Sequence, residues 1–150
     1  MIISWTLSAI IWCSSMPLDR FERNRIKDRT KTEVLSSLER AIGCCDTISD
    51  GIKDVDKESF FGNQMLMKAT AMDMMSIGNF MDGMPAVIFE TAPKLKGLYG
   101  FRCVIAHDYG NDEFSYETLW EVVSQELPSV KDSLIKVRDS IISGEISLKE

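Results

Sequence analysis

Apolar residues recur at intervals of three and four along most of the chain beyond residue 25, and this spacing restricts the fold more than any other feature. Residues 30–52 form one such segment, and no part of the chain alternates convincingly with the period of two that marks a half-buried strand. The apolar face of this segment comprises Val34, Leu35, Leu38, Ala41, Ile42, Cys45 and Ile48. The sequence therefore predicts an all-α fold, a bundle of four or five helices.

Three more helices are predicted after residue 52. The second begins near residue 56, and its apolar face comprises Phe60, Phe61, Met65, Leu66, Ala69, Met72 and Ile77. The third begins at Pro93, which suits the first turn of a helix, and ends near Tyr109, before Gly110. The fourth begins near Ser115, and Pro128 is expected to kink it. Its apolar residues are Leu119, Trp120, Val123, Leu127, Val130, Leu134, Val137 and Ile141.

The methionines are concentrated in the second of these helices and in the residues that follow it. Seven of the nine lie between Met65 and Met84. Methionine is flexible and fills irregular gaps, so we interpret this stripe as core filler or as a contact between two copies of the chain. An adaptable binding groove is the less favoured alternative.

Length and composition indicate one globular domain with no cofactor. A chain of 150 residues is long enough to bury a hydrophobic core without staples, and the net charge of -6 argues against a protein that coats nucleic acid. A small basic site remains compatible with that charge. The four cysteines match neither a zinc site nor a redox motif, and there is only one histidine. We therefore expect reduced thiols, no metal site and a cytoplasmic location.

The first 25 residues are an extension of uncertain status, and residues 26–150 form the predicted helical domain. Residues 1–15 are apolar, but they lack the positive start of a signal peptide and are shorter than the roughly 20 residues that span a membrane. They are interpreted as an extension from an upstream start, or as a short strand or helix packed on the body. Membrane attachment is less favoured, so no membrane partner is expected.

The segment Gly100–Tyr109 holds the candidate site. It contains the only histidine, His107, with Arg102 five residues before it and Tyr109 two residues after it. On a helix, five residues place Arg102 and His107 about 140° apart and roughly 7.5 Å apart along the axis. Arg102 also occupies a position on an apolar face, where a charge needs a partner or a polar cleft. This predicts a site at a boundary between helices or between subunits.

Each of these residues also has an interpretation without function. A histidine near a helix C-terminus is favoured by the helix dipole, an arginine is commonly a surface residue, and a tyrosine before a glycine commonly packs. Their occurrence together favours function. Metal-free RNA cleavage needs a base, an acid and positive charge at the phosphorane. Because one chain has one histidine, a mechanism with two would require a two-fold dimer.

Residues 102–109 reproduce the Arg-x4-His-x-Tyr motif of HEPN-domain proteins. The chain resembles the HepT-like toxin branch of that family, whose partner is a minimal nucleotidyltransferase antitoxin. The likeness continues through Leu119–Val123 and Glu126–Pro128, and it covers residues 30–142.

The resemblance implies a homodimeric helical bundle that acts as a metal-independent endoribonuclease toxin. Arg102 would contact the RNA phosphate, and His107 would act in acid–base catalysis. Tyr109 would be the hydroxyl to which the antitoxin attaches AMP, and a phosphate there would compete with RNA for Arg102. Asp108 would orient His107, or it is a polar residue at the helix end with no special role.

Two departures from the family pattern leave alternatives open. The family usually has a polar residue, often asparagine, directly after the motif arginine, whereas this chain has Cys103. One alternative is therefore a catalytically silent HEPN module that binds a nucleotidyltransferase partner or a nucleotide. Another is a structural adaptor that uses the methionine-rich helix. The chain also has a basic run, interpreted as a solvated helix face or, less favoured, as a contact for RNA or antitoxin: Arg20, Arg23, Arg25, Lys27, Arg29 and Lys31.

Overall fold

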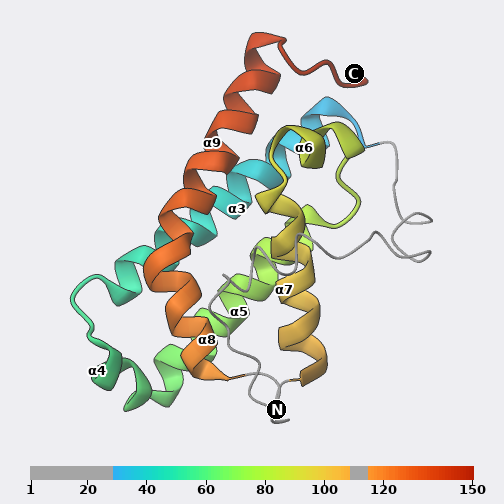
Figure 1. Cartoon of the computed structure of the whole chain (residues 1–150). Helices are drawn as coiled ribbons and strands as arrows, with labels where there is room; N and C mark the ends of the chain where they lie inside the picture. Colours follow the sequence, from blue (N-terminus) through green and yellow to red (C-terminus); the bar gives the residue numbers. More distant parts are fainter. Residues whose placement is uncertain (1–28, 109–114) are drawn as a thin grey trace.

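The structure, a computed structural model, describes residues 29–108 and 115–150, with the backbone alone for residues 107 and 108. These residues form helices and contain no strand, so the all-α prediction is confirmed (Figure 1). Four helices are long: α3 (Lys31–Ile52), α5 (Gln64–Met81), α7 (Lys94–Asp108) and α9 (Leu127–Ser143). In the described part of the chain α3 packs against both α5 and α9, while α7 packs mainly on α5.

Short elements connect the long helices. They are α4 (Lys57–Phe61), α6 (Ala86–Thr91), α8 (Tyr116–Glu121) and the π-helix η1 (Val122–Glu126). The prediction of one helix from residue 56 is wrong, because it is divided into α4 and α5 at Gly62. There the Asn63 side chain accepts a hydrogen bond from the backbone N–H of Leu66 at 3.0 Å and starts a new helix. The six-residue α6 was not predicted.

The first long helix agrees with its prediction. Thr30 caps α3 in a reciprocal arrangement: its Oγ1 accepts from the Glu33 backbone N–H at 3.3 Å, and the Glu33 carboxylate accepts from the Thr30 N–H at 2.9 Å. The predicted apolar face is the buried face, on which only Leu35 is partly exposed. Its buried apolar residues are Val34, Leu38, Ala41, Ile42, Cys45 and Ile48.

The structure has a π-helix just before Pro128, where the sequence predicts a kink. Proline has no backbone N–H, and its ring crowds the carbonyl of the residue four positions earlier, which is Ser124. The helix from α8 widens to η1 at these residues and resumes as α9 at Leu127. The buried residues continue across the interruption, with Leu119, Val123, Leu127 and Val130 all in the core.

The structure corrects the predicted face of α5. Met65 and Met72, which were expected to point inward, are 84% and 64% exposed, and Ala69 is exposed as well. The residues that α5 buries are Met67, Thr70, Ala71, Met74, Ile77, Gly78 and Met81. Methionine and alanine lie all around this helix, so apolar spacing alone could not select the buried face.

The two described members of the basic run both contact other parts of the fold. Arg29 donates hydrogen bonds to the backbone oxygens of Phe80 and Asp82, at 3.3 and 3.1 Å, and a further one to the hydroxyl of Ser37. Lys31 lies 3.8 Å from the Glu150 carboxylate. Arg29 thus joins α3 to the end of α5 and is not a solvated residue. The other four basic residues and the predicted extension, residues 1–25, lie outside the described residues.

No helix in the described part of the chain combines the length and the apolar character needed to cross a bilayer.

Candidate functional site

Arg102 lies where α7 packs on α5, the most extensive helix contact in the described residues. Its neighbours on the same face of α7, Leu98 and Ile105, are buried, while Arg102 itself is half-buried. Arg102 therefore lies at a boundary between helices, and the site expected at such a boundary stays a prediction.

A glycine permits this close packing. A Cβ atom added at Gly78 of α5 would lie 2.3 Å from the Arg102 Cβ and 2.8 Å from the Leu98 carbonyl oxygen. Both distances are too short for any side chain, so the stem of Arg102 lies directly on the α5 backbone. The absence of a side chain at Gly78 thereby determines the path that the Arg102 side chain takes from α7 along α5.

The next residue of α5 holds the guanidinium group. The Nε–H of Arg102 donates a hydrogen bond of 2.8 Å to Oδ1 of Asn79. Arg102 forms no ion pair with any side chain that the structure describes. Among the described residues, the guanidinium group is thus held by a neutral amide, and a guanidinium group bonded through Nε can still donate from both Nη groups to phosphate oxygens.

The other predicted site residues follow on the same helix or just beyond it. His107 and Asp108 form the end of α7, where the backbone continues the helix from Arg102. Their side chains, and Tyr109 as a whole, lie outside the described residues. The roles of His107, Asp108 and Tyr109 therefore stay predictions.

The described cysteines are free thiols, as expected. Burial raises the pKa of Cys45 to about 12, with a smaller contribution from Cys44. Burial also raises the pKa of Cys44, and the charge of Asp73 adds to the effect. Both thiols of α3 are therefore protonated at neutral pH and serve as packing groups. Cys103 is half-buried beside Arg102, on α7.

An exposed apolar strip on α5 leads to the Arg102 site. Met65, Met72 and Asn79 are spaced seven residues apart and are all exposed, so they lie along one side of the helix. Ala69 adds to this strip. We call Met65, Ala69 and Met72 the exposed α5 face. It ends about two turns before the asparagine that holds Arg102.

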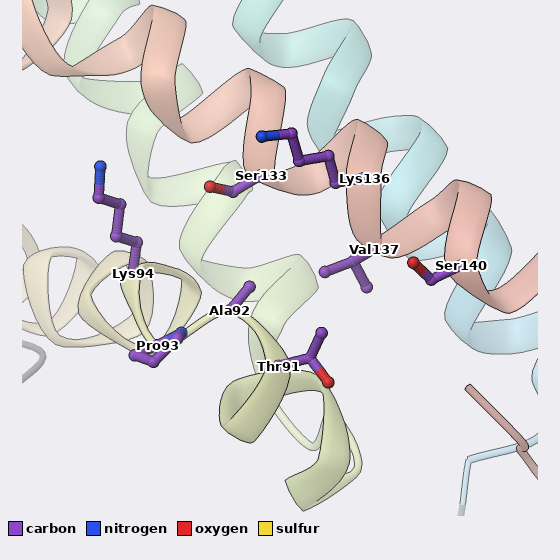
Figure 2. A pocket seen from close by; sticks show the side chains of 8 residues that line it. All are labelled: Thr91, Ala92, Pro93, Lys94, Ser133, Lys136, Val137 and Ser140. Carbon is purple, nitrogen blue, oxygen red and sulfur yellow. The ribbon is translucent and has the colours of Figure 1, made fainter. Parts of the chain in front are cut away.

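A separate pocket lies between the α6–α7 connection and α9. Figure 2 shows the side chains that surround this hollow of about 340 Å³: Thr91, Ala92, Pro93, Lys94, Ser133, Lys136, Val137 and Ser140. The Nζ of Lys94 donates to the Ser129 hydroxyl at 2.6 Å. None of the predicted site residues lines this pocket, so it is distinct from the Arg102 site.

Sequence reasoning did not identify Gly78 or Asn79. The one available signal was that two residues of low helix propensity stand side by side inside a helix. That signal does not reveal a partner 23 residues away. The contact with Arg102 became evident only from the packing of α5 on α7.

Two proteins of the archaeon Methanocaldococcus jannaschii are similar to this chain. "Putative RNase MJ0125" is 28% identical over 109 residues, which cover 71% of this chain and 92% of that protein. "Putative RNase MJ1216" is 27% identical over 109 residues, which cover 71% of this chain and 88% of that protein. No family model matches the sequence. No solved structure matches it significantly.

Proposed function

We propose that this chain is a metal-independent endoribonuclease of the HepT-like kind, with Arg102 and His107 as its catalytic residues. The observation that carries the proposal is the environment of Arg102. Its charge is uncompensated among the described side chains, it is held by a neutral amide, and it shares a helix with the only histidine. The similarity to two proteins named as RNases supports the same conclusion.

The chemistry assigned to these residues is an internal transesterification of RNA. The 2′-oxygen attacks the adjacent phosphorus and loses its proton to a base, while the bond from phosphorus to the 5′-oxygen breaks and that oxygen takes a proton from an acid. His107 moves these protons, and Arg102 stabilises the negative charge of the phosphorane. The products carry a 2′,3′-cyclic phosphate and a 5′-hydroxyl.

The proposed site forms across a homodimer: we assign the base and the acid of this reaction to two histidines, and each chain has one. The exposed α5 face supports this part of the proposal, because its large apolar side chains lie on the side of α5 that carries Asn79. We propose that a second copy covers Met65 and Met72 and supplies the second histidine.

The enzyme is further proposed to act as a toxin that a minimal nucleotidyltransferase silences by attaching AMP to Tyr109. An AMP phosphate at residue 109 would lie on the same segment as Arg102 and compete with RNA for its guanidinium group. The support for this step is the Arg-x4-His-x-Tyr motif itself.

The test is cleavage of RNA by the purified protein in the presence of EDTA. We expect the wild type to release products with cyclic phosphate ends, and both Arg102→Ala and His107→Ala to lose at least about 100-fold in rate. Arg138→Ala, an arginine on α9 far along the chain from the site, is the matched control and should cut normally. A folded wild type that binds but never cuts RNA would instead favour the catalytically silent module.

The dimer is tested separately with Met65→Glu and Met72→Glu. A charge on the exposed α5 face should convert a dimer to a monomer in sedimentation, and RNA cleavage should disappear although Arg102 and His107 are intact. Cleavage at the wild-type rate by a confirmed monomer would contradict a site shared between two chains.

A further inference from the structure

The contact between Asn79 and Arg102 joins a side chain outside the sequence motif to the residue on which the proposed reaction depends. The Oδ1 atom of Asn79 accepts from the Arg102 Nε–H at 2.8 Å, and the preceding Gly78 lets the arginine stem lie on α5. The residue that follows Arg102 on its own helix is Cys103, whose side chain carries a thiol and no amide. The amide beside this arginine is thus supplied by a different helix.

We propose that Asn79 is the positioning residue of Arg102 in the ribonuclease site. This inference rests on the proposed function. A guanidinium group is planar, so anchoring Nε fixes the plane in which both Nη groups donate. With Nε bonded to Asn79, the Nη edge remains for two phosphate oxygens, which is the bidentate geometry of strong arginine–phosphate contacts.

The neutrality of Asn79 matters as much as its position. A carboxylate there would accept the same hydrogen bond, but it would pair with the arginine charge and compete with phosphate for it. An alanine there would leave the long side chain without an anchor. Only a neutral acceptor holds the guanidinium group and leaves its full charge for the substrate.

A purely structural hydrogen bond would also explain the contact, and the two roles predict different results for Asn79→Asp. A structural role predicts normal cleavage, since the acceptor is kept. Positioning predicts a different outcome: the variant should bind a 2′-O-methyl RNA, which cannot be cut, about tenfold more weakly. The slope of log affinity against log salt should fall by about 0.7, the value of one lost contact to single-stranded RNA.

Asn79→Ala provides the complementary result. It retains the arginine charge but not its orientation, so we expect kcat to fall about tenfold while KM changes little. Asn63→Asp is the matched control, because it adds the same charge to α5 and aspartate also caps helices well. Sixteen residues, roughly 24 Å of helix, separate it from Asn79. It should bind and cut as the wild type does.

A spectroscopic measurement separates failure of this inference from failure of the proposed function. The ¹⁵N-labelled Nε–H of Arg102 should exchange slowly with water in the wild type and in Asn63→Asp, and rapidly in Asn79→Ala. Equal exchange in all three proteins would overturn the positioning role.

Slow exchange that depends on Asn79, in a wild type that does not cut RNA, would remove the proposed function but retain the anchoring of Arg102. Wild-type RNA binding, salt slope and cleavage in Asn79→Asp would overturn the inference in an active enzyme.

Discussion

The contact of α3 with α9 and the contact of α5 with α7 differ in the partners of their charged side chains. Between α3 and α9, Lys131 pairs with Asp46, and Arg138 lies 3.3 Å from Glu39. Between α5 and α7, Arg102 meets the neutral amide of Asn79 and no described carboxylate. The first contact pairs two of its cations with carboxylates, and the second holds its arginine through a neutral amide.

This difference assigns different purposes to the two contacts. Paired surface charges add modest stability to the fold. Because each cation already has a carboxylate partner, it does not need an anionic ligand. A half-buried guanidinium group that meets no described carboxylate contributes less to the fold, but it is suited to bind an anion. The outward side of α5 also carries side chains that do not stabilise the fold, because its exposed methionines are not packed in the core. The α5–α7 contact is therefore where function is expected.

The largest expected effect compares the two arginines. Arg102→Ala should reduce RNA cleavage by at least about 100-fold and change thermal stability little. Arg138→Ala should do the reverse, with normal cleavage and a loss of at most about 1 kcal/mol in the free energy of unfolding. Cleavage rates and urea unfolding of both variants provide the measurement. Equal cleavage by the two would remove the distinction between the helix contacts.

The two sides of α5 provide the next test. Met74 is buried and Met72 is 64% exposed. We expect Met74→Ala to lower the free energy of unfolding by about 2–5 kcal/mol through the cavity it leaves. Met72→Ala should change it by less than about 0.5 kcal/mol in the monomer. If Met72 lies in a dimer, its effect should appear instead in the dependence of Tm on protein concentration. A large loss in monomeric Met72→Ala would contradict the exposed face.

The sequence predicted the features of a helix that depend on its own residues, and it missed those that depend on contacts with other helices. The bounds and the buried face of α3 were predictable, because its cap and its polar side are contained in its own residues. The buried face of α5 was not, since apolar residues surround that helix and the choice depends on α3 and α7. The division at Gly62 was missed because the apolar spacing of Phe60, Phe61 and Leu66 continues across it.

The same rule separates the parts of the site. Arg102 was predictable as a boundary residue because its neighbours on the helix are apolar and an isolated charge among them requires a polar partner. The identity of that partner was not, because Asn79 lies on another helix and reaches Arg102 only when Gly78 allows close packing. His107 and Tyr109 rest on the motif alone.

Two glycines sharpen the comparison further. Gly43 of α3 is exposed, and a Cβ added there would meet nothing within 4 Å. Gly43→Ala should therefore stabilise the helix by about 0.5–1 kcal/mol. Gly78→Ala should instead cost about 1–3 kcal/mol, because Arg102 and the Leu98 carbonyl would have to move. It should also reduce RNA cleavage, whereas Gly43→Ala should not. Equal stability of both variants, measured by urea unfolding, would contradict the close packing of α5 on α7.

The last comparison concerns the buried thiol of the α3 side, whose contribution to stability depends on pH. The pKa of Cys45 is about 12 in the folded protein, whereas an exposed thiol in the unfolded chain has a pKa of about 8.5. Between these values the unfolded chain releases a proton that the folded protein keeps. The Cys45 contribution to stability is therefore fully present below about pH 8.5 and declines as pH rises towards about 12, by at most about 1.4 kcal/mol per pH unit.

Cys45→Ala should remove this decline, so the difference in unfolding free energy between the wild type and the variant should shrink as pH rises from 8 to 11. Urea unfolding at a series of pH values measures it. Gly43→Ala changes the same helix without removing a titrating group, and its curve should run parallel to that of the wild type. If the Cys45→Ala curve also runs parallel, the thiol ionises as readily in the folded protein as in the unfolded chain, and the α3 core admits water at that position.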